Sequence, residues 1–139
     1  MEKISDFSVS SDKHRLNVDT IHGFLKRSDW AAKRTRETVV KSIDQSLCFG
    51  AYQGARQIGF MRVVTDTCTF AYLCDVFVDE EFRGLGISRR MLEAVLVHPD
   101  LQKLRRFVLA TSSAHGLYEK FGFQLVPDNK FMEIKNDDV

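Results

Sequence analysis

The feature that most constrains the fold is a direct passage from an apolar strand pattern into a helix across two glycines. Residues 69–78, TFAYLCDVFV, are apolar almost throughout, which is typical of a central strand covered on both faces. In the following stretch, EEFRGLGISRRML (80–92), apolar side chains recur at helical spacing from Ser88, and Pro99 marks the helix end. The stretch predicts a buried strand, a tight turn and a helix in succession.

The other residue patterns place further strands and helices around this stretch. β-Branched and aromatic residues on either side of a Gln-Gly turn at 53–54 predict a hairpin, and apolar residues at helical spacing predict helices. The expected strands are 7–10, 47–52, 56–66, 105–111, 122–126 and 131–134, and the expected further helices are 17–28, 35–47 and 113–121. Charged residues over 34–37 indicate a solvated helix face. The order, βααβββαβαββ, indicates a mixed α/β fold.

Composition limits the size and the partners of this fold. With 139 residues, 44% of them hydrophobic, the chain fits a single domain over residues 1–139. The 20 basic and 19 acidic residues nearly cancel, so we expect neither nucleic acid nor a membrane as partner. No apolar leader or membrane-spanning run is found, and the three cysteines have no metal-type spacing. We therefore expect a cytoplasmic protein with reduced thiols and no metal.

The two glycines lie where an anion could bind. Gly84 and Gly86 stand between the strand end and the helix start, where backbone N–H groups lack intrahelical partners and the helix dipole is positive. Glycine lets a phosphate approach these amides closely, and Arg83 and Arg89 add positive charge. The glycines alone are compatible with two interpretations: a turn that binds a phosphorylated ligand, or a strand-to-helix connection without a ligand. A dinucleotide fingerprint would need glycine or alanine at Arg89, and a P-loop would need G-K-[ST].

Two motifs together resemble the GNAT superfamily of acyl-CoA-dependent N-acetyltransferases. VFVDEEFRGLGISRRML (76–92) is similar to the acyl-CoA-binding motif Arg/Gln-x-x-Gly-x-Gly/Ala, with Arg83, Gly86 and Ser88 at the fixed positions. AHGLYEKFGF (114–123) is similar to the family's Ala-x-x-Leu-Tyr-x-x-x-Gly-Phe. The resemblance implies a central, mixed, mostly antiparallel splayed β-sheet flanked by helices. Ser88 departs from the usual glycine or alanine, but its small side chain leaves room for a phosphate.

The resemblance also implies how acetyl-CoA is held. In the family, loop amides bind the pyrophosphate of coenzyme A, and the strand before the loop, here 75–78, pairs with the pantetheine arm. The implied contacts are Phe77, Val78, Arg83, Gly84, Leu85, Gly86, Ile87, Ser88 and Arg89. Acetyl-CoA is therefore the expected acyl donor.

Tyr118 and Asp75 are the expected catalytic residues. Tyr118 matches the position that commonly protonates the departing thiolate in the family, and a phenol stays protonated at pH 7. The alternative is a helix tyrosine that packs above Phe121 and Phe123. Asp75 is the one carboxylate inside an apolar strand, so we expect it to be paired or functional. It would either bind or deprotonate the acceptor amine, or serve as a satisfied structural aspartate. Some members that acetylate polyamines carry Leu-Glu-Asp-x-x-Val at this place, to which LCDVFV is similar, but the glutamate position here holds Cys74.

The acceptor pocket is expected near the first helix. Phe24 and Trp30 are candidates to line it, with core or lid packing as the alternative. His115 titrates in a useful range, although a helix cap or a surface position also fits it. We expect acetyl transfer from acetyl-CoA to a primary amine of a small molecule or peptide. The alternative is a non-catalytic module of the same fold that binds or senses acyl-CoA. Homodimers are common in the family, so the resemblance is compatible with one.

Overall fold

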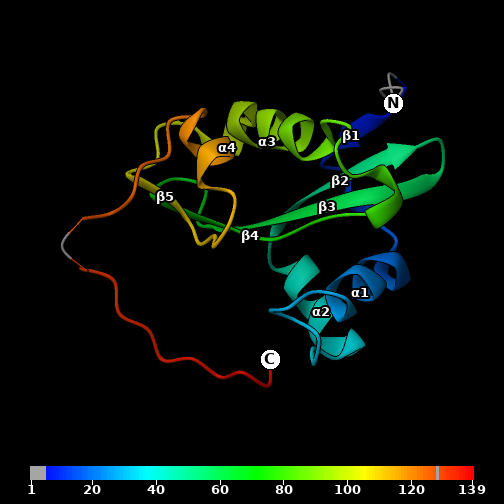
Figure 1. Ribbon diagram of the computed structural model, residues 1–139, viewed down its shortest axis with the longest axis horizontal. Coiled ribbons are helices and arrows are strands. Elements are labelled where there is room, and N and C mark those ends of the chain that lie inside the picture. The colour runs from blue at the N-terminus through cyan, green and yellow to red at the C-terminus, as the bar shows by residue number, and fades with distance from the viewer. Residues whose placement is uncertain (1–5, 128) are drawn as a thin grey trace.

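A five-stranded sheet forms the centre of the molecule (Figure 1). The computed structural model describes residues 6–127 and 129–139. The strands are β1 (Ser8–Ser10), β2 (Leu47–Gln53), β3 (Arg56–Thr65), β4 (Phe70–Val78) and β5 (Arg106–Leu109), in that order across the sheet. Neighbouring strands are antiparallel except β4 and β5, which are parallel. The sheet is thus mixed and mostly antiparallel, as the sequence predicts.

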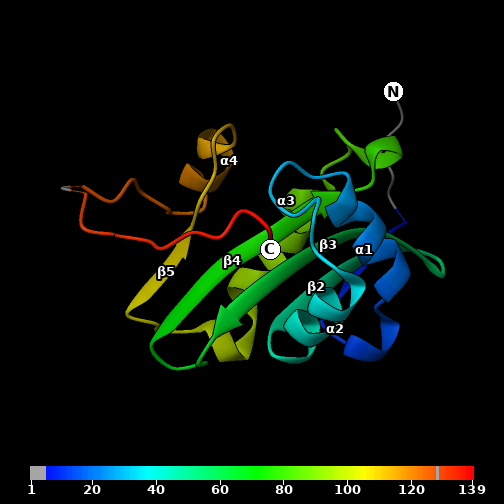
Figure 2. The same ribbon diagram turned by 90° about the horizontal axis from the view of Figure 1, so that it is seen from below.

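Helices cover both faces of this sheet (Figures 1 and 2). The helices are α1 (Val18–Lys26) and α2 (Arg36–Asp44) on one face, and α3 (Ile87–Val97) and α4 (His115–Glu119) on the other. The side chains of Asn17 and Thr35 cap α1 and α2 by accepting hydrogen bonds from first-turn N–H groups. None of the helices in the described part of the chain is long and apolar enough to cross a membrane.

The apolar strands are explained by two hydrophobic clusters, one on each face of the sheet. On one face, α3 buries Met91, Leu92 and Val95 in the larger cluster. On the other face, α1 and α2 pack against Phe60 of β3 and Phe77 of β4. The central strands β3 and β4 are therefore covered on both sides, and each large apolar side chain buried there contributes about 2 kcal/mol.

The strands β4 and β5 separate part-way along their length. Their ladder joins Phe70–Leu73 to Arg106–Leu109, and β4 then continues to Val78 without β5 beside it. The register of β4 against β3 also shifts in this region, where Asp75 has a left-handed φ of 51°. Such a bulge bends a strand and redirects its side chains. The two strands thus open a wedge between residues 74–78 and the loop that follows β5.

The C-terminal segment does not form the two closing strands that the sequence predicts. Residues 122–126 and 131–134 carry no strand, and the end of the chain loops away from the sheet, with the C-terminus lying toward α2 (Figure 1). Its contacts include Phe131 with the Arg106 guanidinium, 5.1 Å from the ring centroid, and Asp138 with Lys33 at 3.3 Å. Met132 is 96% exposed. Apolar and aromatic residues favour strands, but a strand also needs a partner backbone, which the local sequence does not supply.

Candidate active site

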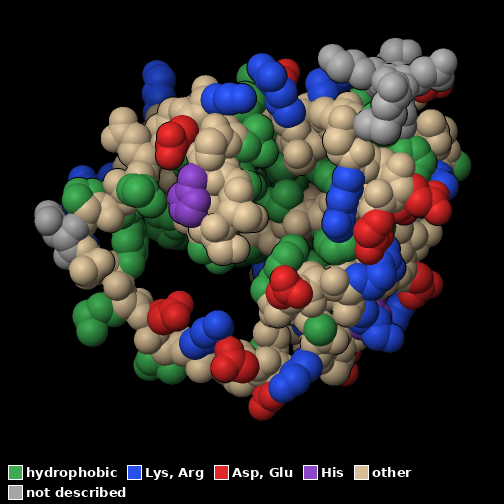
Figure 3. Space-filling view, viewed as in Figure 1, with side chains coloured by type: hydrophobic (Ala, Val, Ile, Leu, Met, Phe, Trp, Pro, Cys, Tyr) green, Lys and Arg blue, Asp and Glu red, His purple; other side chains and the backbone are tan. Residues whose placement is uncertain are grey.

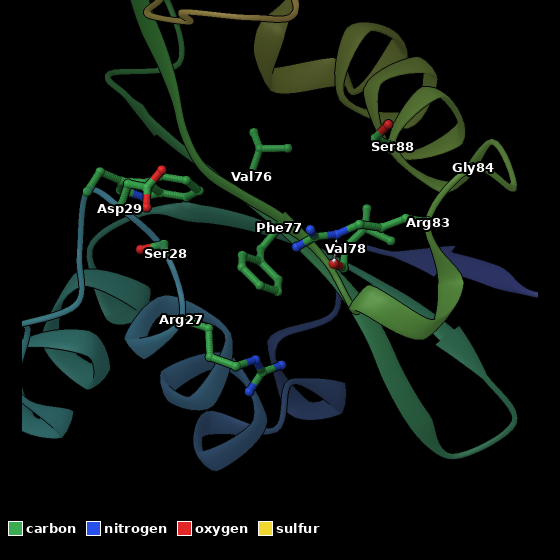
Figure 4. Close-up of a pocket in the computed structure, with 10 residues that line it drawn as sticks. Arg27, Ser28, Asp29, Val76, Phe77, Val78, Arg83, Gly84 and Ser88 are labelled. Atoms are coloured by element: carbon green, nitrogen blue, oxygen red, sulfur yellow. Dashed lines mark hydrogen bonds between the residues drawn. The ribbon is translucent and has the colours of Figure 1, made fainter.

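A cleft of about 410 Å³ opens between the loop after α1 and the turn that joins β4 to α3 (Figure 4). It is lined by Arg27, Ser28, Asp29, Trp30, Val76, Phe77, Val78, Arg83, Gly84 and Ser88. Figure 3 shows this side of the molecule hollowed between α3 and α1, with hydrophobic side chains in the hollow and charged ones at its rim. The cleft therefore combines an apolar wall from β4 with positive charge at the turn.

The turn at Gly84 and Gly86 needs glycine for its backbone conformation. Their φ angles are 77° and 82°, a left-handed region that costs a residue with a Cβ about 1–2 kcal/mol. Within the described residues, a Cβ built on Gly86 would meet no atom within 4 Å, so the space in front of it is open. Gly86 caps α3 without a side-chain hydrogen bond. The first-turn N–H groups of α3 are therefore available to an anion.

Two arginines lie beside this turn, and they are held differently. Arg83 donates from Nε to the carbonyl oxygen of Val78 at 3.0 Å, and its guanidinium lies 5.0 Å from the centroid of the Phe77 ring. Its side chain is exposed and extends across the cleft (Figure 4). Arg27 instead makes two hydrogen bonds to Glu80, at 2.8 and 2.9 Å, which lower the pKa of Glu80 to about 2. Arg83 is therefore the cation more available to a phosphate.

The cleft holds five of the nine residues expected to contact coenzyme A: Phe77, Val78, Arg83, Gly84 and Ser88. The other four, Leu85, Gly86, Ile87 and Arg89, do not line it. The Ile87 side chain is buried in the core, and Arg89 lies 3.4 Å from Glu93, one turn further along α3. Sequence reasoning missed residues 27–29, because nothing in a polar stretch after a helix shows that it will face β4.

A second cavity, of about 400 Å³, occupies the wedge between β4 and the loop after β5. It is lined by Trp30, Tyr72, Leu73, Cys74, Asp75, Val76, Leu109, Ala110, Thr111, Ser112, Ser113, Ala114 and Tyr118. Trp30 and Val76 line both this cavity and the cleft, so the two spaces meet there. The glycine turn is thus joined to a chamber bounded by β4, and we call this chamber the acceptor cavity after the expectation that an acceptor pocket lies near Trp30.

Tyr118 is the predicted acid, and it lines the acceptor cavity from α4. The residue is 7% exposed, and its ring packs edge-on against Phe123 with 5.9 Å between centroids. Burial raises the pKa of its phenol above the ordinary value. The phenol is therefore protonated at neutral pH, and the residue borders both this cavity and a cavity of about 260 Å³ beside β5.

Both carboxylate oxygens of Asp75 accept hydrogen bonds from protein side chains. Its Oδ2 accepts hydrogen bonds from Nη1 of Arg34 and Nε of Arg62, each at 2.8 Å. Its Oδ1 accepts a further bond from Nε1 of Trp30 at 3.1 Å. Of the two roles that the sequence leaves open for Asp75, this geometry supports the structural one, because three protein donors already bind its two carboxylate oxygens.

The structure places Trp30, but not Phe24, at the acceptor cavity. Phe24 is 1% exposed and stacks on Phe77 with 5.0 Å between ring centroids. The expectation that Phe24 lines the pocket is therefore corrected: α1 turns this ring toward the sheet, which is the core-packing alternative. Trp30 lies in the loop after α1 and is 51% exposed.

The remaining ionisable candidates have different surroundings. Cys74 lines the acceptor cavity, and burial raises the pKa of its thiol to about 11, so the thiol is neutral. His115 instead lines a cavity of about 260 Å³ between β5, α4 and residues 123–126. In the part of the chain that the structure describes, no three His, Cys, Asp or Glu side chains are placed to hold a metal ion.

Sequence reasoning missed Arg34 and Arg62. Arg62 lies inside the apolar pattern of β3, and its partner in the ladder with β4 is Cys74, next to Asp75. Isolated charges of opposite sign on neighbouring predicted strands are a signal that could have found this pair. Arg34 carries no such signal, and its side chain is 12% exposed rather than on a solvated helix face. Only the tertiary structure brings its loop to β4.

A protein-family model for the acetyltransferase (GNAT) domain matches residues 44–125, more than half of the chain. The chain belongs to the GNAT acetyltransferase family. A provisionally named acetyltransferase of Gibberella zeae is 32% identical over 139 aligned positions, which cover 83% of this GNAT chain and 77% of that protein. The family resemblance that the two sequence motifs indicate is therefore confirmed.

Solved structures share the fold of this GNAT chain. One from Xanthomonas campestris pv. campestris, a provisionally named acetyltransferase of the GNAT family, is 46% identical, covers 96% of both chains and has a TM-score of 0.92. A GNAT family acetyltransferase from Elizabethkingia anophelis, solved with acetyl-CoA bound, is 16% identical, covers 97% of this chain and 92% of its own, and has a TM-score of 0.67. The predicted GNAT-type fold class is confirmed, and the second likeness concerns the fold alone.

Proposed function

We propose that this GNAT chain is an N-acetyltransferase that moves an acetyl group from acetyl-CoA to a primary amine of a small molecule or peptide. The observation that carries the proposal is the junction of the cleft and the acceptor cavity at Trp30 and Val76. An acyl donor held in the cleft would present its thioester at the entrance of the cavity that contains Tyr118. Membership of the GNAT acetyltransferase family supports this donor, and a structure of the same fold was solved with acetyl-CoA.

The residues of the cleft suit coenzyme A in its charge and in its shape. The first-turn N–H groups of α3 and the glycines before them suit a pyrophosphate, and Arg83 adds a full positive charge. Past Leu73, β4 has no strand of the sheet on its β5 side, so its backbone N–H and C=O groups can pair with an extended chain of amides such as pantetheine. We assign the predicted contacts Leu85, Gly86 and Ile87 to the backbone of this turn.

The proposed reaction is direct transfer within this junction. The neutral amine attacks the thioester carbonyl carbon and forms the C–N bond, and the C–S bond then breaks. Tyr118 donates its phenolic proton to the departing thiolate, which gives free coenzyme A. The proton that the amine loses passes to water in the cavity, and the Tyr118 phenolate regains a proton from water. The products are an N-acetylated amine and a thiol.

We assign Asp75 a positioning role in this reaction. Its carboxylate ties Trp30 and Arg34, both in the loop between α1 and α2, to β4. That loop forms a wall of the cleft and of the acceptor cavity through Trp30. Loss of the carboxylate should therefore loosen a wall of the site rather than remove a base.

A non-catalytic acyl-CoA-binding or sensing module is the second candidate. The observation that favours it is Cys74, a neutral thiol at the place where polyamine-acetylating members of the family carry a glutamate. With Asp75 ion-paired, the lining of the acceptor cavity offers no carboxylate free of a partner to deprotonate an amine. Such a module would bind acetyl-CoA in the same cleft without turnover.

Turnover separates the two candidates. The protein is incubated with acetyl-CoA and a panel of amino acids, polyamines, aminoglycosides and peptides, and release of free thiol is followed. An acetyltransferase gives release that depends on an amine and that falls about 10²-fold in Tyr118→Phe. Saturable acetyl-CoA binding without amine-dependent release would instead support the binding module.

A further inference from the structure

The outer edge of β5 has no neighbouring strand among the described residues. β5 is the last strand of the sheet, and its ladder is made with β4 alone. In such a ladder, every second residue of a strand turns its backbone N–H and C=O groups away from the neighbouring strand. On β5 these groups face outward, where a further strand can pair with them.

The cavity of about 260 Å³ lies along this edge and separates β5 from the chain that follows α4. Apolar side chains line it from both sides: Phe107 and Leu109 from β5, and Phe123, Leu125 and Val126 from the chain after α4. Within the described part of the chain, no backbone hydrogen bond joins these two sides. The cavity therefore lies where an added strand would lie, and its lining suits apolar side chains.

Residues 131–134, FMEI, have the composition of a strand, and their apolar side chains are uncovered. Met132 is 96% exposed and Ile134 is 105% exposed, so the rest of the chain covers neither side chain. The segment leads away from its own sheet (Figure 1), and further along it Asp138 lies 3.3 Å from Lys33. Neighbouring apolar side chains that are this exposed typically mark a surface that another protein covers.

We propose that two copies of this chain form a homodimer by exchanging residues 131–134, each of which adds a strand to the outer edge of β5 in the other copy. The chain supplies both halves of this contact, an unpaired edge and an unpaired segment with the composition of a strand. In its own copy the segment does not line the cavity. A reciprocal exchange satisfies both halves in each copy and closes with two copies, so it gives a dimer and not a filament.

The exchanged strand has one apolar face and lies beside α4. Side chains alternate along a strand, so Met132 and Ile134 share a face and are buried together in the partner copy. Tyr118 lines the cavity along β5 as well as the acceptor cavity. The partner's strand therefore packs next to the helix that carries Tyr118. The exchange itself does not depend on the proposed reaction, and it is tested without turnover.

The mass in solution is the first test. Size-exclusion chromatography with light scattering should give twice the chain mass of 16.0 kDa for the wild type. Ile134→Glu places a charge on the buried face, and Glu133→Pro removes a backbone donor but keeps the apolar side chains. Each should raise the dimer dissociation constant about tenfold or more. Val97→Glu is the control, because this 75% exposed residue lies on α3, outside the proposed contact.

Cross-linking distinguishes exchange from a segment that folds back onto its own β5. Met132 is replaced by a photo-reactive analogue of methionine, and isotopically light and heavy copies are mixed at low concentration and then concentrated. We expect cross-links that join a light and a heavy chain and reach residues 107–110 or 123–126.

Three outcomes would overturn the proposal. The first is a wild type that stays monomeric, and the second is a dimer that neither Ile134→Glu nor Glu133→Pro weakens. The third is cross-linking to these residues within single chains only. Both substituted residues are exposed, so circular dichroism should show that each variant keeps the wild-type fold.

Discussion

The indole Nε1 of Trp30 donates a hydrogen bond to Oδ1 of Asp75 over 3.1 Å, and this bond joins the loop after α1 to β4. Trp30 also lines both the cleft and the acceptor cavity. The bond therefore holds in place a side chain that lines both spaces of the proposed reaction.

Trp30→Phe keeps an aromatic ring in this position and removes the hydrogen-bond donor. We expect kcat/KM for the acceptor to fall about tenfold, because the wall of the cavity is less well fixed. The free energy of unfolding should fall by only about 1 kcal/mol. Steady-state kinetics and urea unfolding of the same preparation measure both effects. Wild-type kinetics in this variant would show that the loop is held without the bond.

The glycine turn is tested by a matched pair of substitutions. Gly86→Ala and Gly54→Ala both place a Cβ at a left-handed φ, 82° and 58°, with open space around it. Each should cost about 1–2 kcal/mol of stability for the same backbone reason. Only Gly86→Ala should weaken acetyl-CoA binding, because its Cβ lies beside the first-turn N–H groups of α3. If calorimetry finds equal acetyl-CoA affinity in the two variants, the pyrophosphate does not bind at this turn.

Tyr118→Phe removes the proposed proton donor and keeps the ring packing against Phe123. We expect kcat to fall about 10²-fold while acetyl-CoA affinity and stability hardly change. Tyr52→Phe is the control: its hydroxyl is buried without a partner among the described residues, so its removal should leave kcat unchanged and raise stability by up to about 1 kcal/mol. If Tyr118→Phe keeps the wild-type kcat, Tyr118 packs in the core and does not donate the proton.

The pH dependence of kcat should reflect the ionisation of the Tyr118 phenol. Because burial raises the pKa of Tyr118 above the usual value of about 10, its protonated form persists below that pH and is lost only above it. We therefore expect kcat to stay level up to about pH 10, and kcat/KM to fall at low pH as the acceptor amine becomes protonated. A pH–rate profile measures this. An alkaline fall of kcat well below pH 10 that disappears in Tyr118→Phe would contradict the raised pKa.

Asp75→Ala should be strongly destabilising. It leaves the guanidinium groups of Arg34 and Arg62 largely buried without their counter-ion, which typically costs about 3 kcal/mol. Asp19→Ala is the comparison, because that carboxylate pairs with Arg36 at the same 2.8 Å but is 81% exposed, and its loss should lower stability far less. Urea unfolding gives both values. Equal costs would mean that burial adds nothing to the ion pairs of Asp75.

The sequence predicts the parts of the site that depend on local geometry. Gly84 and Gly86 are identifiable because a left-handed turn before a helix requires glycine wherever it occurs. Tyr118 is identifiable from its motif. The strand β4 is identifiable from its apolar pattern, which burial on both faces requires. For the glycines and for β4 the neighbouring residues carry the physical cause, whereas Tyr118 is assigned by the family resemblance of its motif.

The parts that depend on distant segments are not predicted. Phe24 and Trp30 are aromatic residues of one region, and only the packing of α1 against Phe77 decides that the first is core and the second lines the site. Arg34 resembles a solvated residue until its loop meets Asp75. The prediction of the closing strands is wrong for a similar reason. Residues 131–134 have the composition of a strand but lack a neighbouring strand.

The central claim is that acetyl passes from coenzyme A to a primary amine at the junction beside Trp30 and Tyr118. The most direct measurement uses isotopically labelled acetyl-CoA, with mass spectrometry of the acceptor and thiol titration on the same sample. The account predicts one labelled N-acetyl product for each free thiol released, at a rate that depends on the amine and on Tyr118. Saturable acetyl-CoA binding, with the same slow thiol release whether or not any amine is present, would contradict it.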